Sequence, residues 1–200
     1  QENAEPSSFT STGVLKGIQA AIYHKLGKDS LQDVHIAIQG IGKVGYGLAE
    51  HLHNLGAKLT VSDINQEACN LAEDKLGASV VDNDLIHKIK CDVFSPCALG
   101  GAINDITIKE LNTSIIAGAA NNQLARSHHG HILHEKGILY APDYVINAGG
   151  LISASSFYFK NDSSIVENQI SNIYHLMLNI FERSSLENIH SSVVADQIAE

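Results

Sequence analysis

The sequence predicts a doubly wound α/β fold, a mostly parallel sheet with helices on both faces, followed by a helical C-terminal tail. Up to Asn147, short apolar segments alternate with segments that carry apolar residues at helical spacing. This alternation is typical of a parallel sheet, because its strands are buried on both faces and a helix leads from each strand to the next. After Asn147 the spacing is helical alone.

The first expected element is a helix that begins near Thr10 to Thr12 and ends at Gly27. Its apolar residues share one face: Leu15, Ile18, Ile22 and Leu26. Two apolar runs that follow are expected to be strands, DVHIAIQ at 33–39 and AKLTVSD at 57–63.

Each of these two strands leads into a helix. The helix after the first strand carries Leu48, Leu52 and Leu55, and Gly56 closes it. The helix after the second strand is expected to run from Asn65, a suitable N-cap, to Gly77.

The remaining elements follow the same order with weaker patterns. Three further strands are expected within CDVFSP (91–96), SIIAGAA (114–120) and GILYAPDYVIN (137–147). The tail contributes a long amphipathic helix at 163–184 and a second helix from residue 191 onward.

Composition restricts the class of protein. The formal net charge is −9, with 13 Lys and Arg against 22 Asp and Glu, which argues against nucleic acid or anionic membranes as partners. Three unevenly spaced cysteines form no disulfide framework and indicate free thiols in a reducing cytoplasm. No apolar run approaches the roughly 18 to 20 residues of a membrane span. The chain lacks an initiator Met, so we expect it to be a piece of a longer, cytoplasmic protein.

The loop after the first expected strand contains the pattern Gly-x-Gly-x-x-Gly. Its glycines are Gly40, Gly42 and Gly45, with Lys43 and Val44 between the last two. In a Rossmann-like fold such glycines permit a tight turn, a close backbone approach to a pyrophosphate and close helix–strand packing. The helix N-terminus beyond the loop favours an anion, so all five residues are candidates for binding NAD.

Asp63 is the expected acidic partner of this loop. It ends the next strand, 18 residues after Gly45, where a carboxylate accepts hydrogen bonds from the adenine ribose hydroxyls. Because Ile64, Asn65 and Gln66 offer no cation for a 2′-phosphate, we expect NAD rather than NADP. The alternative is a solvated aspartate at a strand end.

Four further segments complete a family resemblance: PSSFTSTGV (6–14), CDVFSPCALGG (91–101), AGAANNQLA (117–125) and YAPDYVINAGG (140–150). With GIGKVG they resemble the NAD-dependent amino-acid dehydrogenases of the glutamate/leucine/phenylalanine/valine group, above all its leucine–phenylalanine–valine branch. The resemblance implies reversible oxidative deamination of an L-amino acid to a 2-oxo acid and ammonia. It also implies one reversed strand in the sheet.

The resemblance also implies a domain division and an assembly. Residues 1–150 are similar to the NAD-binding domain with its leading helix, and residues 151–200 to helices that continue the same domain. The family's N-terminal catalytic domain, with its acid–base and carboxylate-binding lysines, has no counterpart here. We therefore expect this chain by itself to bind NAD and to catalyse nothing, and the full-length protein to be a homo-oligomer.

Several residues match the family's cofactor-binding positions. Thr10 resembles the threonine that reaches the nicotinamide carboxamide; the alternative is an N-cap of the first helix, and the two roles are compatible because a cap at a helix start faces the cleft. Asn147 resembles the asparagine that binds the nicotinamide or its ribose, with Gly149 and Gly150 beneath the ring. The remaining matched positions are Cys97 and Ala98, which would line the cofactor with backbone, and Asn121 and Asn122, near the nicotinamide ribose.

Ile170 and Ile173 are candidates for the substrate pocket. In relatives, apolar residues at matching positions border the substrate side chain, which would imply a branched aliphatic amino acid such as leucine. The alternative is ordinary core, because Val166, Ile170, Ile173, Met177 and Ile180 form one helical stripe.

The histidines of RSHHGHILHEKG (126–137) invite comparison with a metal site. His131 and His134 stand three residues apart on an expected helix, but no cysteine or carboxylate nearby completes a tetrahedral set. We therefore expect no metal and interpret His128, His129, His131 and His134 as surface residues.

Two functions of other classes remain open. One is a non-catalytic module that senses NAD(H), and the other is a degenerate homologue kept for assembly. The helix that carries Thr10 ahead of the first strand favours the dehydrogenase over a sensor. The intact glycine loop, Asp63 and the NAGG segment argue against degeneration.

Overall fold

The computed structural model describes residues 6–159 and 163–199 of the 200-residue chain. Its sheet has six strands: β1 (His35–Gln39), β2 (Lys58–Ser62), β3 (Ser79–Val80), β4 (Cys91–Pro96), β5 (Thr113–Ile116) and β6 (Leu139–Tyr140). The strand order is β3-β2-β1-β4-β5-β6, and every neighbouring pair is parallel. The doubly wound α/β prediction is confirmed, whereas the expectation of a reversed strand is wrong for these six strands.

The reason for the uniform direction lies in the connections. Each strand is followed by a helix or a long loop that returns the chain to the starting edge, as parallel pairing requires. The order reverses between β1 and β4, which are neighbours in the sheet but not in sequence. Ligands of doubly wound sheets bind where the order reverses, outside the carboxyl ends of the strands.

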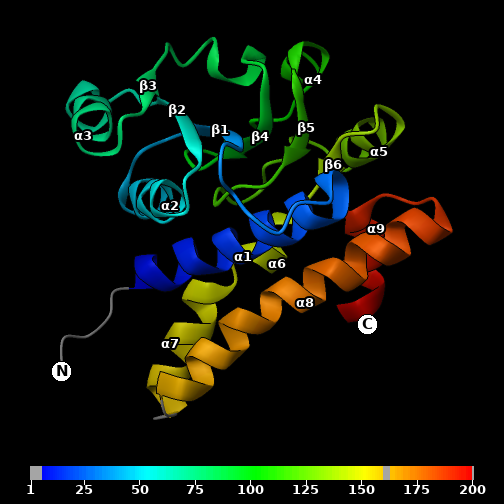
Figure 1. Cartoon of the computed structure of the whole chain (residues 1–200). Helices are drawn as coiled ribbons and strands as arrows, with labels where there is room; N and C mark the ends of the chain where they lie inside the picture. Colours follow the sequence, from blue (N-terminus) through cyan, green and yellow to red (C-terminus); the bar gives the residue numbers. More distant parts are fainter. Residues whose placement is uncertain (1–5, 160–162, 200) are drawn as a thin grey trace.

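Nine α-helices and one short 3-10 helix are described around the sheet (Figure 1). They are α1 (Pro6–Leu26), α2 (Lys43–Asn54), α3 (Gln66–Leu76), η1 (Ile86–Lys88), α4 (Thr107–Glu110), α5 (His128–Glu135), α6 (Asp143–Ile146), α7 (Gly149–Phe159), α8 (Ser163–Glu187) and α9 (Ser191–Ala199). None of these helices combines the length and apolar character that crossing a membrane requires.

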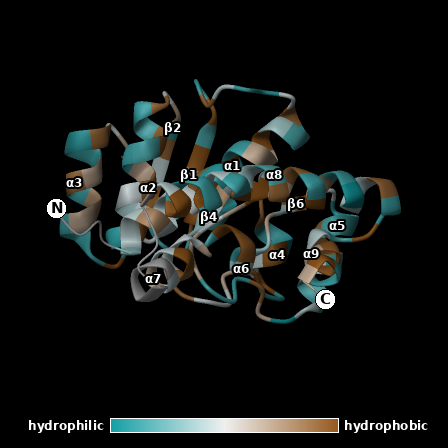
Figure 2. Ribbon diagram, turned by 90° about the horizontal axis from the view of Figure 1, so that it is seen from below, coloured by the Kyte–Doolittle hydropathy of each residue, from teal (hydrophilic) through white to brown (hydrophobic). Residues whose placement is uncertain are grey.

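Alternate strand residues divide the core between the two faces of the sheet. Ile36 and Ile38 of β1 belong to one cluster with α1, α2 and α8, while Ala37 belongs to a second cluster with η1, α4 and α5. Seen from below, α2 and α3 alternate between hydrophobic and hydrophilic residues (Figure 2). Helices therefore cover both faces, as the alternation of short apolar strands and helices predicted.

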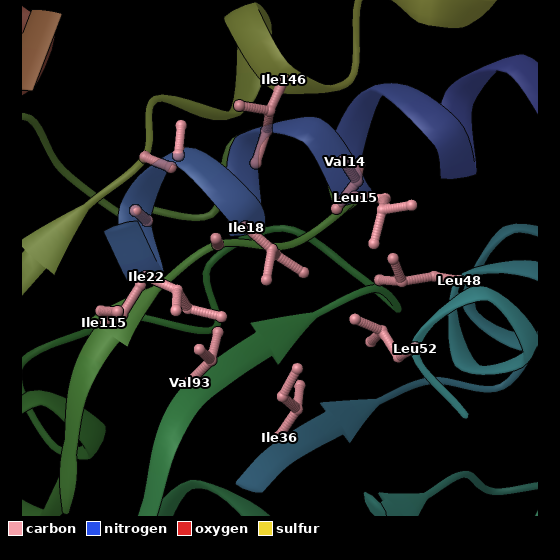
Figure 3. Packing of buried hydrophobic residues seen from close by; sticks show 14 of the residues in the cluster. Val14, Leu15, Ile18, Ile22, Ile36, Leu48, Leu52, Val93, Ile115 and Ile146 are labelled. Atoms are coloured by element: carbon pink, nitrogen blue, oxygen red, sulfur yellow. The ribbon is translucent and has the colours of Figure 1, made fainter. Parts of the chain in front are cut away.

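Helix α1 lies between the sheet and the C-terminal helices. In Figure 3, Ile18 and Ile22 point toward Val93 of β4, and Ile146 of α6 lies on the opposite side of the helix. A Cβ at Gly17 would collide with the Ile146 side chain, so this glycine permits the close approach of α6. Because both faces of α1 are buried, its apolar residues extend beyond the single face that the sequence predicted.

The predicted helix ends are partly confirmed. Asn65 caps α3 by accepting hydrogen bonds from the backbone N–H groups of Glu67 and Ala68, and Gly77 ends the helix at φ 63°. By contrast, α1 begins earlier than expected, at Pro6, which suits a first helical turn because proline has no N–H to satisfy.

Candidate functional site

The loop between β1 and α2 lies at the carboxyl edge of the sheet, beside the point where the strand order reverses. Gly40 has φ 98°, a conformation that L side chains rarely adopt, and its Cβ would stand 2.7 Å from the backbone nitrogen of Ala98. A Cβ at Gly45 would collide with the carbonyl oxygen of Gly40. Both glycines are therefore required by the turn itself.

Gly42 differs from these two glycines. A Cβ at Gly42 would meet no atom within 4 Å, and its φ of −73° is open to any residue. Gly42 is the N-cap of α2 and supplies no side-chain cap to the first N–H groups of the helix. The fold thus leaves open space in front of a helix N-terminus, an arrangement that suits an anion.

Asp63 is tied to the glycine loop by hydrogen bonds. Its Oδ2 accepts from the backbone N–H of Ile41 at 2.6 Å, and its Oδ1 accepts from the N–H of Asn65 at 2.8 Å. Each carboxylate oxygen can accept a second bond, so the group retains capacity for ribose hydroxyls. The half-buried side chain is held between the end of β2 and the loop after β1.

A cavity of about 680 Å³ opens at this edge. Gly40, Gly42 and Asp63 line one side, and Cys97 and Ala98 line another. The remaining lining residues are Gln39, Ile64, Asn83, Asp84, His87, Leu99, Gly100, Gly101, Ala102, Asn104 and Thr107. Two of them are large apolar side chains with unusual exposure, Ile64 at 95% and Leu99 at 83%.

Of the predicted residues, Cys97 and Ala98 follow β4 as expected. The Cys97 thiol lies near the hydroxyl of Ser95 and the backbone N–H of Ala119, and burial raises its pKa. A thiol that stays protonated is a weak nucleophile, so this side chain contributes packing. The Cys97 N–H donates to the Gln39 carbonyl at 2.7 Å, which joins the two loops.

Asn121 and Asn147 come together although they stand on separate segments. The Asn147 amide donates from Nδ2 to Oδ1 of Asn121 at 2.7 Å, while Asn122 adopts a left-handed conformation with φ 52°. None of these three asparagines lines the 680 Å³ cavity.

Thr10 lies in the second turn of α1 and not at its start. Its hydroxyl donates to the Pro6 carbonyl at 3.1 Å, so the alternative of an N-cap is wrong. A Cβ at Gly150 would stand 2.6 Å from the Thr10 hydroxyl oxygen, and one at Gly149 would collide with the Phe9 carbonyl. These glycines therefore allow α7 to begin directly against α1.

Ile170 and Ile173 lie in the core. They are 2% and 4% exposed, and Ile173 reaches α1 at Gly13. All five residues of the stripe, Val166, Ile170, Ile173, Met177 and Ile180, belong to the same buried cluster as the core residues of α1, and α8 lies beside α1 (Figure 1). Their packing agrees with the alternative that they are ordinary core residues. Their role in a substrate pocket stays a prediction.

Two statements about the histidines are corrected. His129 is 1% exposed, so it is not a surface residue, and a carboxylate does lie nearby, because the fold brings in Asp105. Asp105, His128 and His129 have potential ligand atoms within 4.8 Å of one another. His131 is exposed and pairs with Glu135.

The sequence hypothesis missed much of the cavity wall between residues 99 and 107. Its signal was present in the chain as Gly100–Gly101, followed by Asn104 and Thr107, two polar residues suited to a tight turn. His87 is a second omission: it is buried, and its Nε2–H donates to the Glu110 carboxylate at 2.8 Å. The spacing of residues in the sequence could not show that η1, which carries His87, lies at the cavity.

Asp143 is a buried carboxylate behind the asparagine pair. It is 7% exposed, and its Oδ2 accepts from the backbone N–H of Gln123 at 2.8 Å. The fully buried Gln123 amide in turn donates to the carbonyls of Gly118 and Ala120. Burial and the neighbouring Asp143 charge raise the pKa of Tyr140. This network holds the segment after β5 against α6.

Replacing Asp143 with alanine should lower the free energy of unfolding by about 2–4 kcal/mol, because it leaves a buried N–H without an acceptor. Urea denaturation followed by circular dichroism measures this loss. Asp196→Ala is the control, since the exposed Asp196 accepts one hydrogen bond from Tyr144. Equal losses in the two variants would contradict the structural role of Asp143.

The fold and the loop geometry together define a Rossmann-like α/β domain. The chain belongs to the Glutamate/Leucine/Phenylalanine/Valine dehydrogenase family, whose model matches residues 5–70 and 61–196. It is 45% identical over 198 residues to a leucine dehydrogenase of Thermoactinomyces intermedius, a match that covers 99% of this chain and 54% of that protein. It therefore spans about half the length of such relatives.

Solved structures share the fold of this chain. The crystal structure of L-tryptophan dehydrogenase from Nostoc punctiforme matches with a TM-score of 0.96 and 41% identity, over 98% of this chain and 60% of that one. The hetero-hexameric glutamate dehydrogenase from Thermus thermophilus matches with a TM-score of 0.74 at 17% identity, over 94% of this chain and 50% of that one. At this identity, the match to the glutamate dehydrogenase shows only that the two chains share a fold.

Proposed function

We propose that this chain is the NAD-binding part of an NAD-dependent amino-acid dehydrogenase. The reaction would be the reversible oxidative deamination of a branched-chain L-amino acid, such as leucine, to its 2-oxo acid and ammonia. The observation that carries the proposal is the cavity at the strand-order reversal, with Gly42 and Asp63 on its wall. Membership of the dehydrogenase family supplies the class of reaction.

The residues present suit NAD. Open space at Gly42 in front of α2 would receive the pyrophosphate, and Asp63 would accept hydrogen bonds from the adenine ribose. The exposed side chains of Ile64 and Leu99 give the cavity apolar surface for the adenine ring. Bound NAD would supply the hydride acceptor.

The nicotinamide end would be held by the other predicted residues. The Asn121–Asn147 pair presents amide groups near the start of α7, and Thr10 stands against Gly150. Amide and hydroxyl groups can bind the nicotinamide ribose and carboxamide. In this proposal these side chains orient the ring, and they exchange no proton with the substrate.

We further propose that the chain alone is inactive. The residues that line the cavity include no lysine, the residue type to which the family resemblance assigns acid–base chemistry and carboxylate binding. Closure of a second domain would also be required to exclude water from the reacting atoms. Free thiols at Cys69, Cys91 and Cys97 support a reducing cytoplasm as the location.

Relatives support leucine as the substrate. Proteins named leucine dehydrogenase match at 44–45% identity, and those named phenylalanine or L-tryptophan dehydrogenase at 41–42%. Because these identities differ little, the assay compares branched, aromatic and acidic substrates directly.

The test is NADH formation by the full product of the gene that encodes this chain. Branched, aromatic and acidic L-amino acids would be compared at saturating NAD, with the 200-residue chain as the blank. We expect turnover of branched substrates by the full product only. Turnover of aromatic or acidic substrates alone would contradict the substrate class. Absence of turnover with NADH still bound would favour a sensing module, and absence of NADH binding would contradict the proposal as a whole.

A further inference from the structure

We propose that the Asp105–His129 pair is a positioning clamp that fixes one wall of the cofactor cavity. The inference rests on the proposed function, because it concerns how tightly the same cavity binds NADH. It assigns a role to a buried histidine and a carboxylate that do not line the cavity themselves.

The wall in question is the turn at residues 101–107, which is internally rigid. Oδ1 of Asn104 accepts from the backbone N–H groups of Ile106 and Thr107, and Nδ2 donates to the Gly101 carbonyl. The Thr107 hydroxyl donates to the Ala102 carbonyl at 2.7 Å and accepts from the Asn104 N–H at 3.0 Å. These hydrogen bonds join residues 101–107 into one rigid turn.

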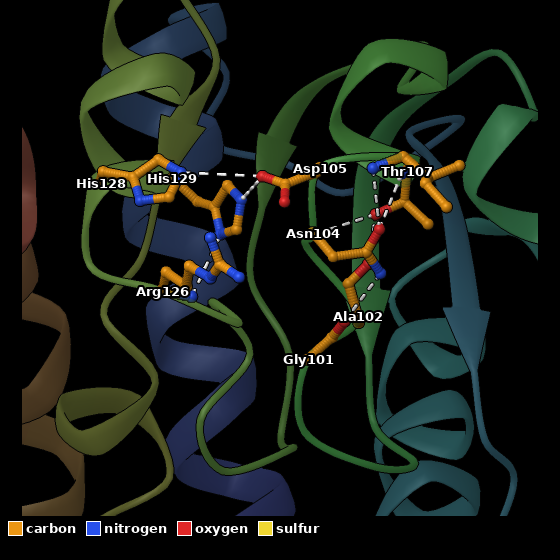
Figure 4. Close-up of polar contacts among 9 residues, drawn as sticks. Gly101, Ala102, Asn104, Asp105, Thr107, Arg126, His128 and His129 are labelled. Atoms are coloured by element: carbon orange, nitrogen blue, oxygen red, sulfur yellow. Dashed lines mark hydrogen bonds and ion pairs between the residues drawn. The ribbon is translucent and has the colours of Figure 1, made fainter.

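Asp105 follows Asn104 in the turn and points toward the histidines of α5 (Figure 4), and it is not among the residues that line the cavity. Its Oδ1 lies 2.9 Å from Nε2 of His129 and 3.7 Å from Nε2 of His128. The hydrogen bond with His129 holds the pKa of the Asp105 carboxyl below its usual value. One end of the turn is thus fastened to the first turn of α5.

The hydrogen bonds of His129 assign its ring to this role. The backbone N–H of Arg126 donates to Nδ1 at 3.1 Å, so Nδ1 keeps its lone pair and the proton of the neutral ring lies on Nε2. That proton is the one donated to Asp105. A metal at Nε2 would require the proton on Nδ1, where it would face the Arg126 N–H, so the cluster is built as a clamp.

The other end of the turn is fastened by backbone. Gly101 donates to the Asn122 carbonyl at 2.8 Å, and Ile103 exchanges hydrogen bonds with Gln123 and Ala125. A Cβ at Gly100 would stand 2.9 Å from the Asn121 carbonyl oxygen, so this contact is already close. The Asp105–His129 contact thus gives the cavity wall a second attachment, beside the backbone hydrogen bonds that join it to the segment bearing Asn121.

The experiment measures dissociation constants for NADH and for ADP-ribose with the 200-residue chain and its variants. Asp105→Ala should raise both constants about tenfold, because the wall contacts the adenosine side and one charge-assisted hydrogen bond holds it. Asp105→Asn keeps an acceptor for His129 and should remain within about twofold of the wild type. The melting temperature should fall in Asp105→Ala, because the buried Nε2–H of His129 loses its acceptor, and it should be kept in Asp105→Asn, so NADH is titrated well below the melting temperature of each variant.

Glu135→Ala is the matched control. Glu135 also pairs with a histidine of α5, His131, at 3.2 Å and is 64% exposed, but it lies outside the cavity. Its NADH affinity should equal that of the wild type. Asp105→Ser, whose side chain is too short to reach His129, repeats the test if the alanine variant is unstable.

Three results would overturn the clamp: unchanged NADH affinity in Asp105→Ala and Asp105→Ser, an asparagine variant as weak as alanine, or an equal loss in Glu135→Ala. Saturable zinc binding that disappears in Asp105→Ala would replace the clamp with a metal centre. Failure of the wild-type chain to bind NADH would instead contradict the proposed function.

Discussion

Gly42→Ala should weaken NADH binding by about 100-fold, a loss of about 3 kcal/mol of binding free energy, while the fold stays intact. The structure leaves this Cβ without a neighbour inside the protein, so the methyl group enters the space that we assign to the pyrophosphate. As an N-cap, alanine is less favourable than glycine, and unfolding should become easier by about 1 kcal/mol or less.

Fluorescence titration with NADH and a thermal melt separate the two effects. Gly47→Ala is the control on the same helix, because its Cβ would meet only the Ser11 side chain, at 3.3 Å. Gly45→Ala is the opposite control, since its Cβ collides with the Gly40 carbonyl and should destabilise the fold itself. An unchanged NADH affinity in Gly42→Ala would place the pyrophosphate elsewhere.

Asp63→Ala should reduce NAD affinity roughly 10- to 100-fold, because it removes charged hydrogen bonds to the ribose. The same change should leave NADP affinity equal or higher, since it removes repulsion of the 2′-phosphate. The ratio of the two affinities is therefore the informative quantity. Competition of NAD and NADP against NADH fluorescence measures it.

Asp84→Ala controls for the charge of the cavity. Asp84 is an exposed carboxylate that lines the same cavity, and its loss should change the affinities for NAD and NADP by similar factors. Asp63→Ala also removes the hydrogen bonds that the carboxylate accepts from the N–H groups of Ile41 and Asn65, and a glycine loop loosened by their loss would lower both affinities together and leave their ratio unchanged. A ratio that does not move in Asp63→Ala would contradict the role of Asp63 in selecting NAD.

Local patterns determined the elements of this fold. The apolar runs at 33–39 and 57–63 contain β1 and β2, and Asn65 and Gly77 bound α3 as cap chemistry predicts. The glycine loop was likewise readable from sequence, because the demand for a positive φ at Gly40 is a property of one residue.

Strand direction and the burial of helices required the tertiary structure. The parallel order follows from how connections cross the sheet, which no single segment encodes. Helix α1 is buried on two faces because α6 and α8 pack on the side away from the sheet, and that contact joins residues far apart in sequence.

The site divides in the same way. The sequence by itself indicated Gly42 and Asp63, because their roles depend on a strand, a turn and a helix in succession. Only the folded chain brought Asp105 to His129, and turned a histidine that looked exposed into a buried hydrogen-bond donor. The physical reason is distance along the chain: backbone conformation is set by near neighbours, whereas burial, hydrogen-bond partners and cavity walls are set by segments that meet only when the sheet is assembled.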